Sequence, residues 1–324
     1  MVAFISVNGL VKHFAVRRSL GEMLTGKRPV VHAVDGVDFT LDVNESVGLL
    51  GESGCGKTTT GRLLLKLETP TAGTISIGGQ DLATLSGDAL RAFRRTAQLV
   101  FQNPFDALNP RFSIARVLRE PLINAGVPRA EHPDRIALVL DRVRMRGIGD
   151  LLEKFPHQLS GGQLQRIVLA RALILGPRFI VADEPVSMLD VSVRAGILNL
   201  MREIQAALGL TAIYISHDLT LVRYVARRTM VMYLATLVED GPTDRVVQAP
   251  QHPYTKALVA AVPIPRVNQA RGPLPIRGNV PDAHNPPPGC RFHDRCPIAV
   301  QRCRSEIPLL REVAPGHRAA CHLV

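Results

Sequence analysis

The sequence predicts an α/β fold built around a parallel sheet. Short apolar runs alternate with longer segments whose apolar residues recur at helical spacing. Such runs are typical of strands buried on both faces of a parallel sheet, and their alternation with helices indicates an α/β architecture. The expected strands are Val47–Leu50, Ala97–Phe101, Phe179–Ala182, Thr211–Ile215 and Met230–Leu234. The expected helices include Leu63–Leu67, Ser192–Leu208 and Leu219–Arg227, with a mostly helical insert over Asn109–Leu159.

The composition is that of a globular chain with room for a sizeable core. The 324 residues are 46% hydrophobic and 21% charged, which is too apolar for a disordered chain. Lys and Arg number 39 against 28 Asp and Glu, so the net charge is +11. This balance favours an anionic partner, which can be a nucleotide, a nucleic acid or an acidic membrane face.

Two features of the sequence predict an intracellular location. The longest apolar region, Leu164–Ala182, is interrupted by Arg166, Arg171 and Arg178, so it does not predict a transmembrane helix. The first residues, Met1–Lys12, are typical of a strand and lack the regions of a signal peptide. Thiols are kept reduced inside the cell.

The first motif that carries chemistry is the glycine-rich loop Gly51–Thr58, which matches G-x-x-x-x-G-K-[ST]. It follows the expected strand Val47–Leu50 and opens a helix expected over Thr58–Leu67, as a phosphate-binding P-loop does. Its glycines let backbone N–H groups wrap a phosphate, and the helix N-terminus adds partial positive charge. We therefore expect Lys57 to reach the β- and γ-phosphates of a nucleotide and the Thr58 hydroxyl to bind Mg²⁺.

Two further segments are interpreted together with this loop. The apolar run Phe179–Ala182 ends in Asp183 and Glu184; the first carboxylate can orient the hydration shell of Mg²⁺ and the second can polarise a water. The segment Leu159–Gln163, Leu-Ser-Gly-Gly-Gln, precedes a helical run and offers a second anion-binding helix start. Each also fits an ordinary strand end or helix cap, and only the combination with the P-loop indicates a nucleotide site.

The order and spacing of these motifs resemble the ATP-binding subunits of ABC transporters over residues 5–260. The other motifs of that family follow in order: the adenine-stacking aromatic Phe14, the Q-loop residue Gln102, the D-loop Ser187–Asp190 and the switch residue His217. The resemblance implies a P-loop NTPase of the ABC cassette type. Its RecA-like core would carry an antiparallel β subdomain and a helical subdomain at about 105–170. The cassette would span 1–260, followed by a Pro/Cys-rich C-terminal extension over 261–324.

The resemblance also implies a mechanism. Two subunits would meet head to tail, each ATP lying between the P-loop of one and Ser160–Gln163 of the other. Glu184 would be the general base, His217 would hold the γ-phosphate, and Gln102 would touch Mg²⁺ and the transmembrane partner. The implied ATP-binding residues are Phe14, Gly51, Ser53, Gly54, Cys55, Gly56, Lys57, Thr58, Thr59 and Asp183. ATP would be contacted in trans by Ser160, Gly161, Gly162, Gln163 and Asp190, and Mg²⁺ held through Thr58, Gln102 and Asp183.

Longer stretches narrow the resemblance to the ATPases of oligopeptide and dipeptide importers. This narrower resemblance rests on Phe101–Arg111, Gln251–Leu258 and the cysteine-bearing tail. The Gly-Gly-Gln signature and the long insert before Ala33 resemble the F-type subunit of that family. The resemblance implies ATP and Mg²⁺ as cofactors and a peripheral place on the cytoplasmic face of the cell (inner) membrane. The implied partners are a second, different ATPase subunit, two transmembrane permease subunits and an extracytoplasmic substrate-binding protein. Import of nickel chelates or glutathione is the alternative within the same role.

The C-terminal tail has its own composition. After about residue 262 it holds 11 of the 24 prolines and four of the five cysteines. We therefore expect either that something other than apolar burial holds it or that it stays loose. The cysteines are Cys290, Cys296, Cys303 and Cys321, spaced C-x5-C-x6-C-x17-C. Disulfides are disfavoured inside cells, and the C-x2-C knuckle of zinc ribbons is absent. Four thiolates can hold a [4Fe–4S] cluster, which the family resemblance also implies. Zn²⁺, with additional ligands among His293, His317 and His322, and metal-free thiols remain open.

A nucleic-acid-acting ABC ATPase is the competing interpretation, since a charge of +11 would suit it. The chain has a single cassette, whereas translation factors of that type carry two. Aromatic residues are only 4% and Trp is absent, so no stacking platform accompanies the basic residues. We therefore expect no nucleic-acid partner. The basic segment Arg17–Pro29 is expected to be a loop.

Overall fold

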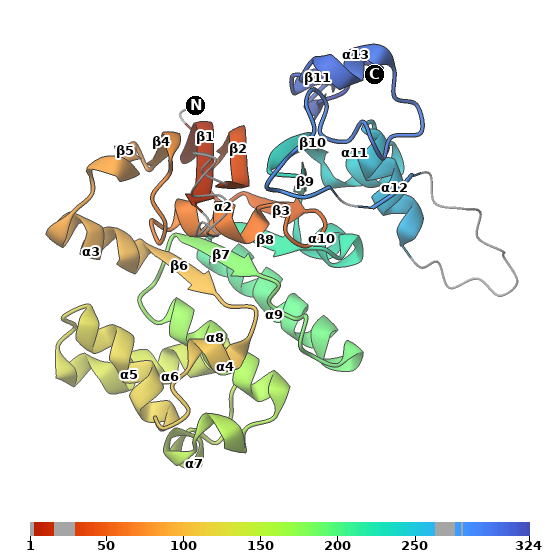
Figure 1. The fold of residues 1–324 in the computed structure, drawn as a ribbon. Coiled ribbons are helices and arrows are strands. Elements are labelled where there is room, and N and C mark those ends of the chain that lie inside the picture. Colours follow the sequence, from red (N-terminus) through yellow and green to blue (C-terminus); the bar gives the residue numbers. More distant parts are fainter. Residues whose placement is uncertain (1–2, 16–29, 263–275, 280) are drawn as a thin grey trace, which may run out of the picture. The chain divides into compact units, whose positions relative to one another are not determined.

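The computed structural model describes residues 3–15, 30–262, 276–279 and 281–324, so the expected loop Arg17–Pro29 lies outside the described residues. The chain divides into two compact units. Figure 1 shows the helices and strands of the described residues. Unit 1 comprises Met1–Leu41, Ser46–Ala83 and Ile215–Val324. Unit 2 comprises Asp42–Glu45 and Thr84–Tyr214.

Unit 1 contains an antiparallel sheet in the order β2-β1-β4-β5 and a second set of strands in the order β11-β12-β10-β9-β3. The strands of the first sheet are β1 (Ile5–Ala15), β2 (Val30–Leu41), β4 (Ala72–Ile77) and β5 (Gln80–Asp81). Those of the second are β3 (Ser46–Leu50), β9 (Arg228–Tyr233), β10 (Thr236–Pro242), β11 (Arg311–Ala314) and β12 (His317–Ala319). The helices are α2 (Lys57–Leu64), α10 (Leu219–Val225), α11 (Thr243–Gln248), α12 (Pro253–Ala261) and α13 (Gln301–Ser305).

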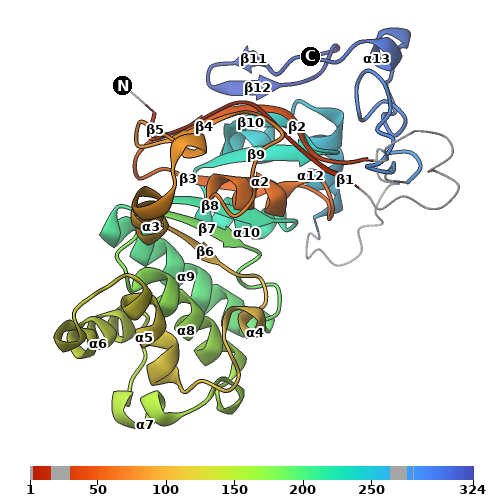
Figure 2. The ribbon, with the colours of Figure 1, turned by 60° about the vertical axis from the view of Figure 1, so that its left-hand side comes forward.

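Unit 2 joins strands in the order β8-β7-β6 to a group of helices. The strands are β6 (Ala97–Val100), β7 (Phe179–Asp183) and β8 (Thr211–Ser216), whose last two residues belong to unit 1. The helices are α3 (Gly87–Thr96), α4 (Pro104–Ala107), α5 (Ile114–Asn124), α6 (His132–Arg142), α7 (Ile148–Glu153), α8 (Gly161–Leu173) and α9 (Val191–Leu208). Helices α5 and α6 pack against α8, and α7 packs against α5 (Figure 2). Residues 101–178, all of which are described, contain no strand.

The predicted α/β fold is confirmed, because each of the five expected strands is present and the pairs β3–β9 and β6–β7 are parallel. Strands β3, β7 and β8 are buried along their whole length, which explains their unbroken apolar sequences. The helix expected to reach Leu67 was predicted too long. It ends at Leu64, because Lys66 takes the left-handed value φ 49° and its N–H donates to the carbonyl of Leu63.

The prediction that the tail cannot rely on apolar burial is wrong for part of it. Strand β12 pairs antiparallel with β10, with Ala319 opposite Glu239, and so extends the strand set of unit 1. Phe292 is only 1% exposed and its ring lies 5.1 Å from that of Tyr233 and 5.5 Å from that of Tyr254. Buried aromatic area of this kind contributes substantially to holding the segment on unit 1.

Charged pairs add to the attachment of β12. The fully buried carboxylate of Glu239 binds His317 Nε2 at 2.7 Å and accepts the backbone N–H of His252 at 2.8 Å. Beside it, Asp240 binds Arg228 at 2.7 Å and also Arg318 of β12. Burial raises the pKa of Asp240, but the two guanidinium groups outweigh burial and lower the pKa below its ordinary value. The carboxylate is therefore charged and paired, which makes this burial tolerable.

Candidate functional site

The P-loop Gly51–Thr58 connects β3 to α2 through positions that only glycine can occupy. A Cβ on Gly51 would lie closer than 3.0 Å to the carbonyl oxygen of Met232, and a Cβ on Gly56 closer than 3.0 Å to that of Ala33. Gly54 and Gly56 also adopt positive φ values of 80° and 105°. At these two glycines the backbone of the loop thus lies directly against β9 and β2.

The start of α2 is built to receive an anion. Its N-cap, Gly56, offers no side-chain hydrogen bond to the first N–H groups, and the first turn has no acidic residue. Lys57 is 6% exposed, and its Nζ donates to the carbonyl oxygens of Gly51 and Glu52, both at 2.8 Å. The unsatisfied N–H groups, the helix dipole and the Lys57 ammonium group all favour binding of a phosphate at the N-terminus of α2. Thr58 is exposed at the same helix start, and Thr59 follows it.

Cys55, like Lys57, is a buried residue of the loop. It is 4% exposed, and burial raises the pKa of its thiol above the ordinary value, although Lys57 opposes the rise. The backbone carbonyl of Cys55 accepts the N–H of Ala235 at 3.0 Å. The Cys55 side chain is therefore a neutral thiol packed in the interior. The backbone of Cys55 is hydrogen-bonded to the turn between β9 and β10.

Unit 2 brings Gln102 and Glu184 together. The Nε2 of Gln102 donates to Glu184 Oε2 at 3.0 Å, although the residues are 82 positions apart. Glu184 has φ 43°, a left-handed value that is rare for a residue with a side chain. It directly follows Asp183, which ends β7 and is 8% exposed. Such backbone strain is typical of functional positions, because the surrounding structure must hold it in place.

The signature segment forms the start of α8. Ser160 is the N-cap, and its hydroxyl accepts the N–H of Gln163 at 3.3 Å, while Gln163 Oε1 accepts the N–H of Ser160 at 3.1 Å. This reciprocal capping box gives Gln163 a structural task that the sequence analysis did not assign. A Cβ on Gly162 would lie 2.7 Å from Val193 Cγ1, whereas one on Gly161 would lie 3.4 Å from Leu189 Cδ2. Gly162 thus permits the close approach of α8 to α9.

The D-loop presents polar and apolar groups at the start of α9. Asp190 is the exposed N-cap of α9, and its backbone carbonyl accepts the N–H groups of Val193 and Arg194. The flanking residues Met188 and Val191 are 65% and 80% exposed. Exposed large apolar side chains beside a charged group are common where a partner surface binds.

Phe14 and His217 lie in unit 1. Phe14 is on β1, is 36% exposed, and has the Lys12 ammonium 4.7 Å from its ring centroid. His217 is exposed and directly follows β8. After it, Asp218 caps α10 by accepting the N–H groups of Thr220 and Leu221. The other predicted residues of unit 1 are those of the P-loop, and unit 2 holds Gln102, Ser160–Gln163, Asp183, Glu184 and Asp190.

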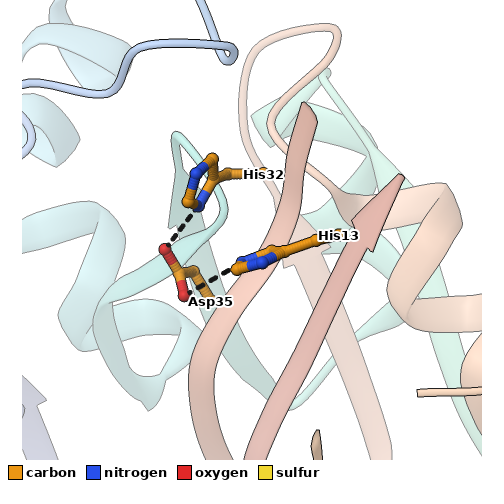
Figure 3. A group of neighbouring side chains, drawn as sticks. All are labelled: His13, His32 and Asp35. Atoms are coloured by element: carbon orange, nitrogen blue, oxygen red, sulfur yellow. Dashed lines mark hydrogen bonds and ion pairs between the residues drawn. The ribbon is translucent and has the colours of Figure 1, made fainter. Parts of the chain in front are cut away.

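Sequence analysis missed a cluster of titratable groups next to Phe14. His13, His32 and Asp35 point toward one another from β1 and β2 (Figure 3), with donor atoms that all lie within 4.8 Å. Spacing alone would suit a divalent cation. However, Arg291 of the tail is ion-paired to Asp35, and its charge, together with the bond from His32, lowers the pKa of Asp35 although burial raises it. The group is therefore an ion-pair network that ties the tail to β2.

The four tail cysteines lie near one another in unit 1, and none forms a disulfide. Cys296, Cys303 and Cys321 are buried and Cys290 is half-buried. The N–H of Cys290 donates to the carbonyl of Cys303 at 2.8 Å. Burial, together with the charges of the three neighbouring thiols, raises the pKa of the Cys290 thiol to about 11.

Within the described residues, no helix combines the length and apolar character needed to cross a bilayer.

A family model described as ABC transporter matches residues 34–187, and one described as oligopeptide/dipeptide transporter, C-terminal region, matches residues 238–303.

Relatives match over almost the whole chain. The probable peptide ABC transporter ATP-binding protein y4tS of Sinorhizobium fredii is 44% identical over 99% of this chain and 90% of its own length. The oligopeptide transport ATP-binding protein AppF of Bacillus subtilis is 42% identical over 98% of this chain and 97% of its own. Among solved structures, the dimeric post-hydrolysis state of the ATP-binding cassette MJ0796 bound to ADP and Pi aligns with a TM-score of 0.63 and 25% identity. That alignment covers 74% of this chain and 98% of the cassette.

The two glycines of the signature should differ in their tolerance of alanine. Gly162→Ala places a methyl group against the stiff side chain of Val193, so we expect a loss of about 1–3 kcal/mol in the free energy of unfolding. Gly161→Ala is the matched control: its methyl group makes ordinary contact, and the change should be neutral or stabilising by up to ~1 kcal/mol. Urea unfolding of both variants measures the difference. Equal stabilities would contradict the close approach of α8 to α9.

Proposed function

The chain belongs to the ATP-binding subunits of the oligopeptide and dipeptide ABC importers, and from this premise we propose how its residues use ATP. Members of this family are ATPases that energise peptide import, so the chain works with membrane permeases and a substrate-binding protein. In the proposal, ATP lies between the P-loop of this chain and the signature segment of a second, different ATPase subunit. The chain is the F-type member of that pair and sits on the cytoplasmic face of the inner membrane.

The P-loop is the observation that carries the proposal. Lys57 and the uncapped N–H groups at the start of α2 bind the β- and γ-phosphates, and Phe14 stacks on the adenine. Thr58, Gln102 and Asp183 supply hydroxyl, amide and carboxylate oxygens, which is the donor chemistry that Mg²⁺ prefers. When bound there, the ion neutralises charge that develops on the phosphate oxygens.

Glu184 is the proposed general base. Its carboxylate accepts a proton from the attacking water, and the Gln102 amide, 3.0 Å away, orients that carboxylate. The left-handed φ of 43° at Glu184 is the backbone conformation in which this contact with Gln102 is made. His217, the residue that follows β8, is proposed to bind the γ-phosphate. The full set of protein contacts to the nucleotide therefore exists only while that phosphate is present. ATP therefore favours the closed dimer, and hydrolysis releases it.

The exposed surface of the D-loop supports pairing with a second cassette. Met188 and Val191 flank Asp190 and are mostly exposed, which suits burial against a partner. Ser160, Gly161, Gly162 and Gln163 are proposed to reach the partner's ATP in trans. Peptides rather than nickel chelates or glutathione are the proposed cargo, because the relatives named above are peptide and oligopeptide transport proteins.

The tail cysteines are proposed to hold a [4Fe–4S] cluster. Thiolates on one tetrahedral zinc would be about 3.8 Å apart, given a Zn–S bond of about 2.3 Å. Among the described residues, however, no three of the cysteine sulfurs lie within 4.8 Å of one another. Cluster thiolates bind different iron atoms and therefore stand further apart. Their neighbouring, mostly buried positions fit this role, in which the cluster contributes to the folding of the tail.

Replacement of Glu184 by Gln tests the assignment of the base. We expect Mg-ATP binding to persist while steady-state hydrolysis by the assembled transporter falls roughly 10²–10⁴-fold, the usual contribution of a general base. Glu131→Gln is the matched control, because this glutamate makes only an exposed ion pair with Arg135. Undiminished turnover in Glu184→Gln would contradict the assignment of Glu184 as the general base.

Metal analysis of the full chain, purified without oxygen, tests the tail. We expect about four iron atoms and about four acid-labile sulfides per chain, with a visible charge-transfer absorption. Cys303→Ser should lower both contents, whereas Cys55→Ser, in the P-loop, should not. Zinc in place of iron, or a chain free of metal, would refute the cluster and leave the ATPase assignment standing.

A further inference from the structure

We infer that Arg295 of the tail is a positioning residue for ATP, because it neutralises and holds Glu52, the second residue of the P-loop. The inference rests on the proposed ATP site. It concerns a contact between residues 243 positions apart, which the motif pattern does not contain. Its consequence is that the tail forms one wall of the nucleotide site rather than an appendage to it.

The contact has the geometry of a strong ion pair. The two terminal nitrogens of Arg295 donate separately to the two carboxylate oxygens of Glu52, at 2.8 and 3.1 Å. The side chain of Arg295 is 6% exposed and that of Glu52 is 29% exposed. Arg–carboxylate pairs of this two-point type fix orientation as well as charge, and Lys cannot reproduce them.

An aromatic cluster holds Arg295 in place. Its guanidinium lies 5.7 Å from the ring centroid of Tyr233 and 5.9 Å from that of Phe292, and it donates to the Tyr233 hydroxyl at 3.5 Å. Burial disfavours the charged guanidinium, but Glu52 and Tyr233 outweigh burial and raise the pKa of Arg295. An arginine guanidinium stays protonated in proteins, and the contacts with Tyr233 and Phe292 set the position of this one.

Every polar group of Glu52 is engaged in this arrangement. Its N–H donates to the Tyr254 hydroxyl at 2.9 Å, its carbonyl accepts Lys57 Nζ at 2.8 Å, and its carboxylate is bound by Arg295. A free carboxylate at this point of the loop would repel an incoming triphosphate. Arg295 removes that repulsion and keeps the backbone of the loop in the shape that receives phosphate.

A second arginine of the same short segment supports the other side of the loop. Arg291 is ion-paired to Asp35, the carboxylate drawn in Figure 3, and donates to the carbonyl of Leu234 at 3.4 Å. The N–H of Asp35 donates to Ala235 O, and the N–H of Ala235 donates to Cys55 O. The tail thus reaches the P-loop both directly and through the β9–β10 turn.

Equilibrium binding of a fluorescent ATP analogue, with Mg²⁺, to the full-length chain tests the inference. Arg295→Gln should weaken binding roughly tenfold, about 1.4 kcal/mol, because the Glu52 carboxylate stays charged but loses its ion pair. Arg295→Lys keeps the charge without the two-point bond and should weaken binding by a smaller factor. Arg318→Gln is the matched control: it removes another tail arginine, paired to Asp240, and should bind like the wild type.

A double variant separates positioning from general damage to the tail. If Arg295 acts through the charge of Glu52, then Glu52→Gln/Arg295→Gln should bind the analogue as tightly as Glu52→Gln alone. A purely structural arginine would instead weaken binding by the same factor in both backgrounds, and that result would overturn the inference. Unchanged binding in a folded Arg295→Gln or Arg295→Lys would also overturn it. Failure of the wild type to bind the analogue would refute the proposed ATP site instead, so the two failures are distinguishable.

Discussion

The P-loop runs between β2 and β9 at a distance that only glycine tolerates, and the rest of unit 1 is arranged around this close approach. Gly51 faces the carbonyl of Met232, and Gly56 faces that of Ala33. The backbone of the loop is therefore fixed by strands on two sides before any ligand binds. This arrangement lowers the cost of ordering the loop around a triphosphate, because little conformational entropy remains to be lost.

Strained residues occur where the structure must hold a group in a special direction. Leu234 and Ala235 form the β9–β10 turn with φ values of 40° and 68°, although such turns favour Asn and Gly. Glu184 takes φ 43° at the end of β7. Each left-handed residue costs on the order of 1–2 kcal/mol. Hydrogen bonds offset part of this free-energy cost. The bond from Ala235 to Cys55 holds the turn against the P-loop, and the bond from Gln102 to Glu184 holds the carboxylate of the proposed base.

The sequence predicted the elements whose signals are local. Buried strands such as β3 and β7 are continuous apolar runs, and the P-loop is a contiguous pattern between a strand and a helix. The pairing of β12 with β10 and the contact of Arg295 with Glu52 join distant parts of the chain, so no local pattern signals them. Proline content predicted a tail that does not rely on apolar burial, but Phe292 and the paired charges hold part of it on unit 1.

If Arg295 positions Glu52 for ATP, the tail and the P-loop form one nucleotide-binding structure. Because coupling between two sites is reciprocal, ATP must stabilise the tail if the tail stabilises the ATP site. Amide hydrogen exchange of the full-length chain, with and without Mg-ATP, measures this directly. We expect the nucleotide to slow exchange in residues 290–296 as well as in 51–58. Slowed exchange in 51–58 with no change in 290–296 would contradict it.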